Sequence, residues 1–138
     1  MGASQINLNS LMQSAEHLRA DERQGLESLF QIIGNDSTTS LKCISLHEVE
    51  GMKCVVYWRK WGESNALECL EELVFRYLPC LEKVFDGGVP TGFRQLRRIT
   101  IQSCPKLKCV FSCNSFRLLH QLEDLKVCYC EEIEEIVE

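Results

Sequence analysis

Apolar side chains recur along this chain every 26 residues, and this repetition restricts the fold more than any other feature of the sequence. The repeats start at five apolar residues: Ala15, Leu41, Leu70, Leu96 and Leu122. Successive starts are 26 residues apart, except for a step of 29 between the second and the third. The positions 3, 5, 8, 11, 14 and 15 residues after each start are also apolar, with Arg23 as the one exception. A period of this length is typical of proteins built from small stacked units.

Within one repeat, the spacing of the apolar positions predicts two segments that face each other. The start and positions 3 and 5 after it alternate as in a strand with one buried face. We expect the chain to turn at position 8, so that positions 11, 14 and 15 bring a second apolar edge back over the first. A single repeat cannot bury this core, whereas repeats stacked as parallel strands about 4.8 Å apart can.

The sequence therefore predicts an α/β-type solenoid. It is a leucine-rich-repeat horseshoe segment with short parallel strands on the concave face and loops or short helical turns on the convex face. We expect residues 15–138 to form this domain with about five repeats, and residues 1–14 to be a lead-in that fits the end of a preceding repeat. Cys104 and Cys130 stand at position 8, where many such repeats carry Asn or Cys. Pro79 and Pro105, one residue after position 8, suit a turn that needs no ladder N–H.

The charge of the chain argues against nucleic acid and membrane as partners. Fifteen basic and 20 acidic residues give a formal net charge of -5, whereas nucleic-acid binding usually leaves a basic footprint. The sequence contains no polybasic anchor and no apolar stretch long enough to span a bilayer. We see no signal peptide at the start of the sequence, so we expect a cytoplasmic protein with reduced thiols.

The cysteines, histidines and carboxylates do not form a pattern that predicts a metal site or catalysis. The nine cysteines lack paired CxxC spacing, so we interpret them as small buried hydrophobic residues. The acidic run from Glu131 to Glu138 surrounds Ile133 and Ile136, as expected for a solvated face around two core residues. None of the three histidines is placed in a recognisable catalytic motif. We therefore expect no metal, no cofactor and no enzymatic activity.

The candidate binding residues lie on the outward side of the predicted strands, at positions 1, 2, 4, 6 and 7. The charges at positions 1 and 2 alternate between repeats, from Glu71-Glu72 to Arg97-Arg98 to Glu123-Asp124. Two interpretations stay open, a charged recognition patch and mutual pairing across repeats, which is worth about 0–1 kcal/mol for each surface pair. The candidates on the concave face are Val74, Arg76, Tyr77, Arg97, Arg98, Thr100, Gln102, Lys126 and Tyr129.

The three extra residues between the second and third starts accompany an aromatic loop. Trp58 and Trp61 stand there beside Arg59 and Lys60. Tryptophan and arginine together are typical of interface anchors, which makes Trp58 and Trp61 candidate loop contacts. The alternative is that both rings cover an edge of the core.

The two C-terminal repeats carry motifs that point to a known family. Residues 96–111 contain a Cys-Pro-x-Leu turn, and residues 122–137 close on Glu-Glu-Ile-Val. Both segments, and the irregular repeat in residues 15–29, resemble the C-terminal leucine-rich repeats of plant intracellular immune receptors of the coiled-coil, nucleotide-binding (NB-ARC) class. The resemblance covers nearly the whole chain.

This resemblance implies a cytoplasmic role in disease resistance. In that family the repeats sense a pathogen protein, or a host protein that the pathogen modifies, and help to hold the receptor inactive. The implied partners are a pathogen effector, a guarded host protein or the receptor's own nucleotide-binding module. The sequence has no GxxxxGK[ST] loop, so ATP binding is not carried over. Because no polar capping unit follows the last repeat, we expect a fragment or a truncated product of a longer protein.

Two other functions compete with this interpretation. The first alternative is a substrate-recognition module of a ubiquitin-ligase adaptor, which also uses leucine-rich repeats. A ligase-binding box of some 40 residues would mark it, but residues 1–40 instead contain an irregular repeat. The second is a thiol enzyme that uses Cys128 and Cys130, which requires a cysteine with a lowered pKa.

Overall fold

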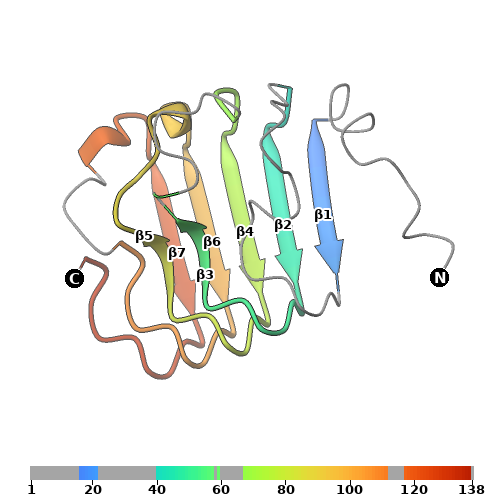
Figure 1. Cartoon of the computed structure of the whole chain (residues 1–138), viewed down its shortest axis with the longest axis vertical. Helices are drawn as coiled ribbons and strands as arrows, with labels where there is room; N and C mark the ends of the chain where they lie inside the picture. Colours follow the sequence, from blue (N-terminus) through green and yellow to red (C-terminus); the bar gives the residue numbers. More distant parts are fainter. Residues whose placement is uncertain (1–15, 22–39, 58, 60–66, 112–116, 138) are drawn as a thin grey trace, which may run out of the picture.

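The computed structural model describes residues 16–21, 40–57, 59, 67–111 and 117–137. In this part of the chain, five short strands form one parallel sheet in the order β1-β2-β4-β6-β7 (Figure 1). They are β1 (His17–Asp21), β2 (Cys43–His47), β4 (Glu72–Arg76), β6 (Arg98–Gln102) and β7 (Asp124–Cys128). This is a parallel β-solenoid with little helix, so the predicted leucine-rich-repeat fold is confirmed. The predicted lead-in, residues 1–14, and the first start, Ala15, lie outside the described residues.

The register of the sheet follows the spacing of the repeats. Glu72 pairs with Arg98, and Arg98 pairs with Asp124, so residues 26 apart lie side by side. Cys43 pairs with Glu72, and the longer step of 29 is thereby accommodated without a change of register. Tyr57 still pairs with Asp86 at the longer step, so the three extra residues follow Tyr57. The extra residues therefore come after β3 in the chain, between Tyr57 and Leu70.

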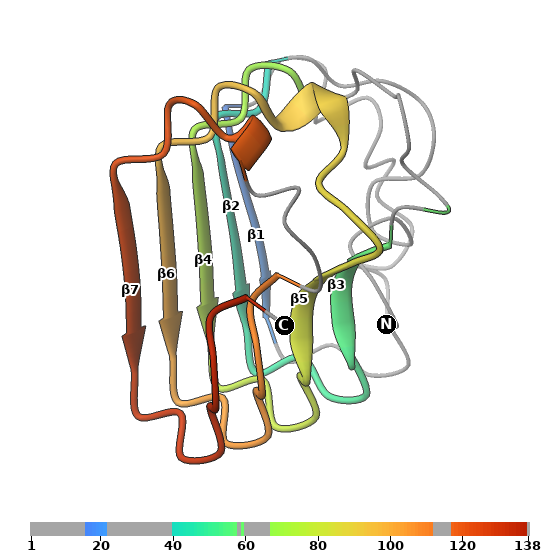
Figure 2. The same ribbon diagram turned by 90° about the vertical axis from the view of Figure 1, so that its left-hand side faces the viewer.

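The side opposite the five-stranded sheet contains extended backbone as well as turns. β3 (Cys54–Tyr57) pairs in parallel with β5 (Lys83–Asp86), and single bridges continue the ladder from Phe85 to Phe111 and from Phe111 to Val137. Figure 2 shows β3 and β5 opposite the larger sheet. We expect loops and short helical turns here, and the 3-10 turn η2 (Thr91–Phe93) is one such turn. The pairing of β3 with β5 was not predicted. The reason is that backbone groups 12 and 13 residues after the start bond between repeats: the Lys53 carbonyl accepts hydrogen bonds from the amides of Glu82 (2.8 Å) and Lys83 (3.3 Å).

The core lies between these two layers. The predicted apolar columns are buried in the repeats that start at Leu41, Leu70 and Leu96, and Phe85 stacks on Phe111 with ring centroids 5.3 Å apart. In the last repeat Ile133 is only partly buried, and Ile136, predicted to be a core residue, is 38% exposed, because no further described repeat packs against it. One buried column was not predicted, because it stands three residues before each start and so outside the positions compared between repeats. Its described members, Leu67, Phe93 and Leu119, are between 0% and 6% exposed. In each case a backbone hydrogen bond links this residue's carbonyl to the amide of the start, which places its side chain under the beginning of the strand.

Burial decreases towards β7. Ile99 and Ile101 in β6 are fully buried, whereas Leu125 and Val127 at the same positions of β7 are only half-buried. In the described part of the chain, β6 has a paired strand on each side and β7 on one side only. The exposure of a core position therefore depends on how many repeats pack against it.

The turn that follows each strand is made by a residue in the left-handed conformation. Glu48, Tyr77, Ser103 and Tyr129, all seven residues after a start, have φ between 56° and 59°. The sequence analysis placed the turn one residue later, at position 8, where Cys104 is in fact buried. Left-handed backbone is uncommon outside glycine, and its recurrence here shows that inter-repeat pairing determines the turn.

A second, tighter turn comes directly after position 8. The amide of Leu81 donates to the carbonyl of Leu78 (3.3 Å), and the amide of Leu107 donates to that of Cys104 (3.1 Å). Pro79 and Pro105 are the second residues of these two turns, a position where proline's fixed φ is favoured and its missing N–H is not needed.

We predict that Ile101→Asp unfolds the solenoid, because an unpaired charge in this core costs about 3–5 kcal/mol. Leu125→Asp should destabilise less, since Leu125 is half-buried. Urea unfolding followed by far-UV circular dichroism measures both, with Ile101→Val, expected to cost about 1 kcal/mol, as the control. An Ile101→Asp variant with the wild-type midpoint would contradict the register described above.

Candidate binding surface

The sheet face is the outward side of the five-stranded sheet, and parallel pairing arranges its side chains in three rows. The outward residues of the strands alternate with less exposed ones, as in Cys43–His47 and Arg98–Gln102, except in β4, where the outward Val74 is also buried. The first row is His17, Cys43, Glu72, Arg98 and Asp124; the second is Arg19, Ser45, Val74, Thr100 and Lys126; the third is Asp21, His47, Arg76, Gln102 and Cys128.

The alternating charges at the start of the strands pair across repeats. The Arg98 guanidinium lies 3.7 Å from the Glu72 carboxylate, and that of Arg97 lies 3.9 Å from the carboxylate of Glu123. The arginine side chains remain 42% and 45% exposed, so solvent screens both pairs. Mutual pairing is therefore present, and it leaves both guanidinium groups accessible to a partner.

The second row is short and weakly polar in its centre. Val74 is only 7% exposed between its paired neighbours Ser45 and Thr100, so this candidate offers a partner little area. Thr100 is half-buried and Lys126 is exposed. This row is therefore accessible mainly at its two ends, through Arg19 and Lys126.

Hydrogen bonds order the third row. Arg76 Nε donates to Gln102 Oε1 at 3.1 Å, which links two predicted candidates across neighbouring repeats. Arg19 Nε donates to the carboxylate of Asp21, and the same guanidinium lies 3.3 Å from His47 Nδ1. Partial burial lowers the pKa of His47, and the charge of Arg19 lowers it further. The imidazole of His47 is therefore held towards its neutral form.

The two tyrosine candidates lie at the carboxyl end of the strands, one residue beyond the third row. Tyr77 is 51% exposed and Tyr129 is 77% exposed. Both are at the left-handed position described above, directly after the last residues of β4 and β7. The loop candidates Trp58 and Trp61 lie outside the described residues.

We expect the cysteines to be buried, and the structure confirms this for half of the eight described ones, Cys54, Cys104, Cys109 and Cys130. Cys43, Cys69 and Cys80 are half-buried and Cys128 is exposed, because outward positions of the repeat also carry cysteine. Burial, together with the charge of the neighbouring Asp86 carboxylate, raises the pKa of Cys54 to about 12. Burial likewise raises the pKa of Cys104 to about 12 and raises that of Cys130. The Cys130 thiol donates to the Cys128 carbonyl at 3.4 Å, so Cys130 does not have the lowered pKa that a reactive thiol requires.

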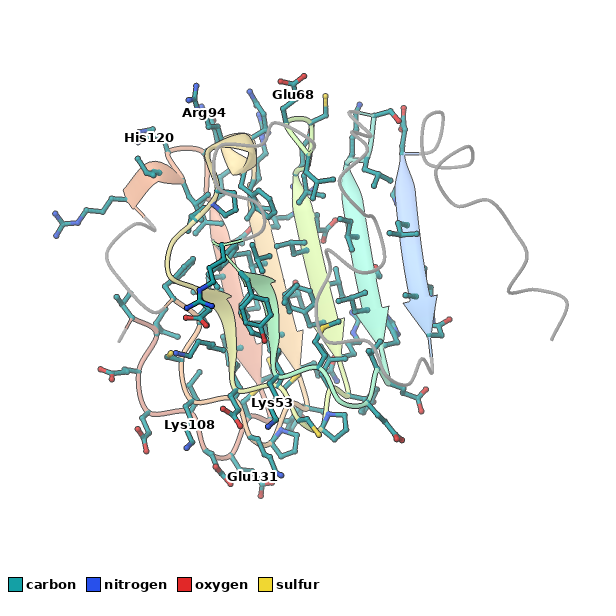
Figure 3. All side chains as sticks on the ribbon, viewed as in Figure 1. Lys53, Glu68, Arg94, Lys108, His120 and Glu131 are labelled. Carbon is teal, nitrogen blue, oxygen red and sulfur yellow. The ribbon has the colours of Figure 1, made fainter. Side chains whose placement is uncertain are left out.

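Hollows of the surface lie along both edges of the sheet. One of about 560 Å³ at the amino ends of the strands is lined by Lys42, Glu68, Cys69, Glu71, Gly92, Arg94 and Gln95. Figure 3 shows Glu68, Arg94 and His120 along this edge, and Lys53, Lys108 and Glu131 along the opposite one. In the residues that the structure describes, no group of three or more His, Cys, Asp or Glu side chains is arranged to hold a metal ion.

Comparison with known proteins shows which family of repeat proteins this chain belongs to. Residues 3–131 match the family model of plant disease resistance protein RPS2-like leucine-rich repeats. The chain belongs to this family. Comparison with curated proteins and with solved structures gave no match. Membership of the RPS2-like family confirms the resemblance to plant resistance proteins and assigns the chain to repeat modules that bind proteins.

The described part of the chain has no helix long and apolar enough to cross a bilayer.

We predict that Arg97→Glu leaves the RPS2-like repeats folded, because the residue is exposed and its ion pair contributes at most about 1 kcal/mol. The measurement is the urea midpoint by circular dichroism. The exchange Arg97→Glu with Glu123→Arg should return the midpoint to that of the wild type. Loss of the fold in Arg97→Glu alone would mean that this position is not on the surface.

We also predict that iodoacetamide at pH 8 modifies exposed Cys128 and leaves Cys54 and Cys104 unmodified in the folded chain. Only the thiolate reacts, and the raised pKa of both buried thiols keeps them protonated. Peptide mass spectrometry measures the modification, and the chain unfolded in guanidinium, where all three should react, is the control. Modification of Cys104 at the same rate as Cys128 would contradict this prediction and would support a reactive thiol at Cys104.

Proposed function

We propose that this chain is a ligand-sensing and autoinhibitory repeat segment of a plant intracellular immune receptor, and that it acts in the cytoplasm. The observation that carries the proposal is the sheet face: ordered, exposed charged side chains on repeats that belong to a resistance-protein family. The occupant is a protein, either a pathogen effector, a guarded host protein or the receptor's own nucleotide-binding module.

The side chains of the sheet face suit a protein partner. Arginine and tyrosine are enriched at the centres of interfaces, because they bury large areas and still make directed polar contacts. Arg76 is held by Gln102, and Arg98 is held near Glu72, so little side-chain entropy remains to be lost on binding. The backbone ladder below them is shared by all five strands, which makes the surface rigid before the partner arrives.

The same arrangement is compatible with both roles of the repeats. A surface that contacts the nucleotide-binding module at rest, and a modified or foreign protein during infection, couples the two events by competition. The arginines at its centre favour acidic groups on either partner. The family match favours this function over a ubiquitin-ligase adaptor, the alternative raised by the sequence.

Affinity purification of the tagged chain from plant cell extract, followed by mass spectrometry, tests the proposal. We expect recovery of a nucleotide-binding receptor module or of a host protein that pathogens target. Arg76→Ala combined with Arg98→Ala should abolish recovery, and Lys108→Ala, an exposed cation outside the sheet face, should not. Recovery of ubiquitin-ligase core subunits instead would support the adaptor, and equal recovery by all variants would exclude the sheet face.

A further inference from the structure

A hollow of about 320 Å³ lies beyond the carboxyl ends of β2, β4 and β6, outside the sheet face. Three consecutive repeats line it with residues at the same two positions, seven and nine after each start. The lining residues are Glu48 and Glu50, Tyr77 and Pro79, and Ser103 and Pro105. None of them belongs to the three rows of the sheet face. The hollow is therefore a separate surface, built by the same repetition.

The backbone that carries this hollow is held by hydrogen bonds between repeats. The amide of Glu48 donates to the Arg76 carbonyl (3.0 Å), and that of Tyr77 donates to the Gln102 carbonyl (3.0 Å). The amide of Ser103 continues the series to Cys128 (2.9 Å). Successive lining residues are thus fixed at about the spacing of neighbouring strands, close to 4.8 Å. Such a site binds without first having to order its own backbone.

The lining has an apolar part and an acidic end. Tyr77 is 51% exposed, and Pro79 and Pro105 add rigid apolar surface beside it. Glu48 and Glu50, both exposed, supply two carboxylates from the neighbouring repeat. Ser103 is small and leaves room next to the tyrosine ring. A cation near such carboxylates and a tyrosine ring gains from both, through charge attraction and through the electron-rich face of the ring.

We propose that this hollow docks an extended segment of a protein partner that carries an arginine or lysine followed by an apolar residue such as proline. The cation lies between the carboxylates of Glu48 and Glu50 and the face of the Tyr77 ring, and the apolar residue packs on Pro79 and Pro105. Charge complementarity sets the direction of the segment, because Lys106, exposed next to Pro105, repels a cation from the other end. The proposal deepens the proposed function, since it adds a second contact of stated chemistry to a protein-binding repeat module.

Tyr129 is a matched control for Tyr77. It stands at the same position of its repeat, has the same left-handed backbone and is more exposed, at 77%. It does not line the hollow. Ser103 shows that serine is accepted at this position of the turn, so Tyr77→Ser and Tyr129→Ser both remove a ring with the backbone conformation retained.

The test is a nuclear magnetic resonance titration of the ¹⁵N-labelled chain with the capped peptide Arg-Pro-Leu-Pro. We expect shifts at the amides of Glu48, Glu50, Tyr77 and Ser103. Tyr77→Ser should weaken binding about two- to fivefold, the range for an exposed cation on an aromatic ring, and Tyr129→Ser should not change it. Glu48→Gln with Glu50→Gln should also weaken binding and reduce its dependence on salt.

Equal binding of the peptide Glu-Pro-Leu-Pro, shifts confined to other residues, or an unchanged affinity of Tyr77→Ser would overturn the proposal. Arg76→Ala with Arg98→Ala separates the two surfaces, since it should bind the arginine peptide like the wild type. If plant partners are captured through the sheet face but the peptide does not bind, only the hollow is refuted. If the peptide binds and no resistance partner is captured, the proposed function fails and the docking site stands.

Discussion

Each repeat buries its apolar side chains against the repeats beside it, and the rest of the structure depends on this packing. Ile44, Leu73 and Ile99 occupy equivalent positions in successive strands and are fully excluded from solvent, while Leu125 in β7 is half-buried. The hydrophobic gain of about 25 cal/mol for each Å² of buried apolar surface therefore comes mostly from contacts between repeats. Stability of this kind is approximately a sum over neighbouring units.

The same packing explains why the functional surfaces are regular. Parallel strands in a common register place equivalent residues in rows, so a change of charge between repeats becomes a cross-strand pair such as Arg98 with Glu72. Rows that do not contribute to the core are free to vary in chemistry, because their side chains point into solvent. The sheet face and the hollow next to Tyr77 are two such sets of rows on one rigid ladder. If one partner contacts both surfaces, binding at the first surface holds it close to the second. The overall affinity is then higher than at either surface alone, without any new contact.

The left-handed turn shows how strongly the ladder constrains the backbone. Glutamate, tyrosine and serine occupy it at Glu48, Tyr77 and Ser103, although a residue with a Cβ is disfavoured there. The hydrogen bonds from these amides to the next repeat offset the cost. A side effect is that position seven projects from the sheet edge, where large side chains such as Tyr77 and Tyr129 stay exposed.

The sequence by itself determined the repeat length, the register and most of the core. A 26-residue period in apolar residues has one simple physical solution, stacked parallel strands, and the step of 29 leaves the register of the paired strands unchanged. It also indicated the outward columns and the alternation of charge, because side chains in a strand point alternately to its two faces.

The tertiary structure alone decided which of these groups a partner can reach. Val74 is covered by its neighbours, and Arg97 and Arg98 are paired yet accessible. The buried column of Leu67, Phe93 and Leu119 and the pairing of β3 with β5 also appeared only there. Glu48 and Glu50 line one hollow with Tyr77 only in the stack, because these residues belong to different repeats. The exposure of a side chain depends on the repeats packed beside it, and the residue pattern of a single repeat does not contain that information.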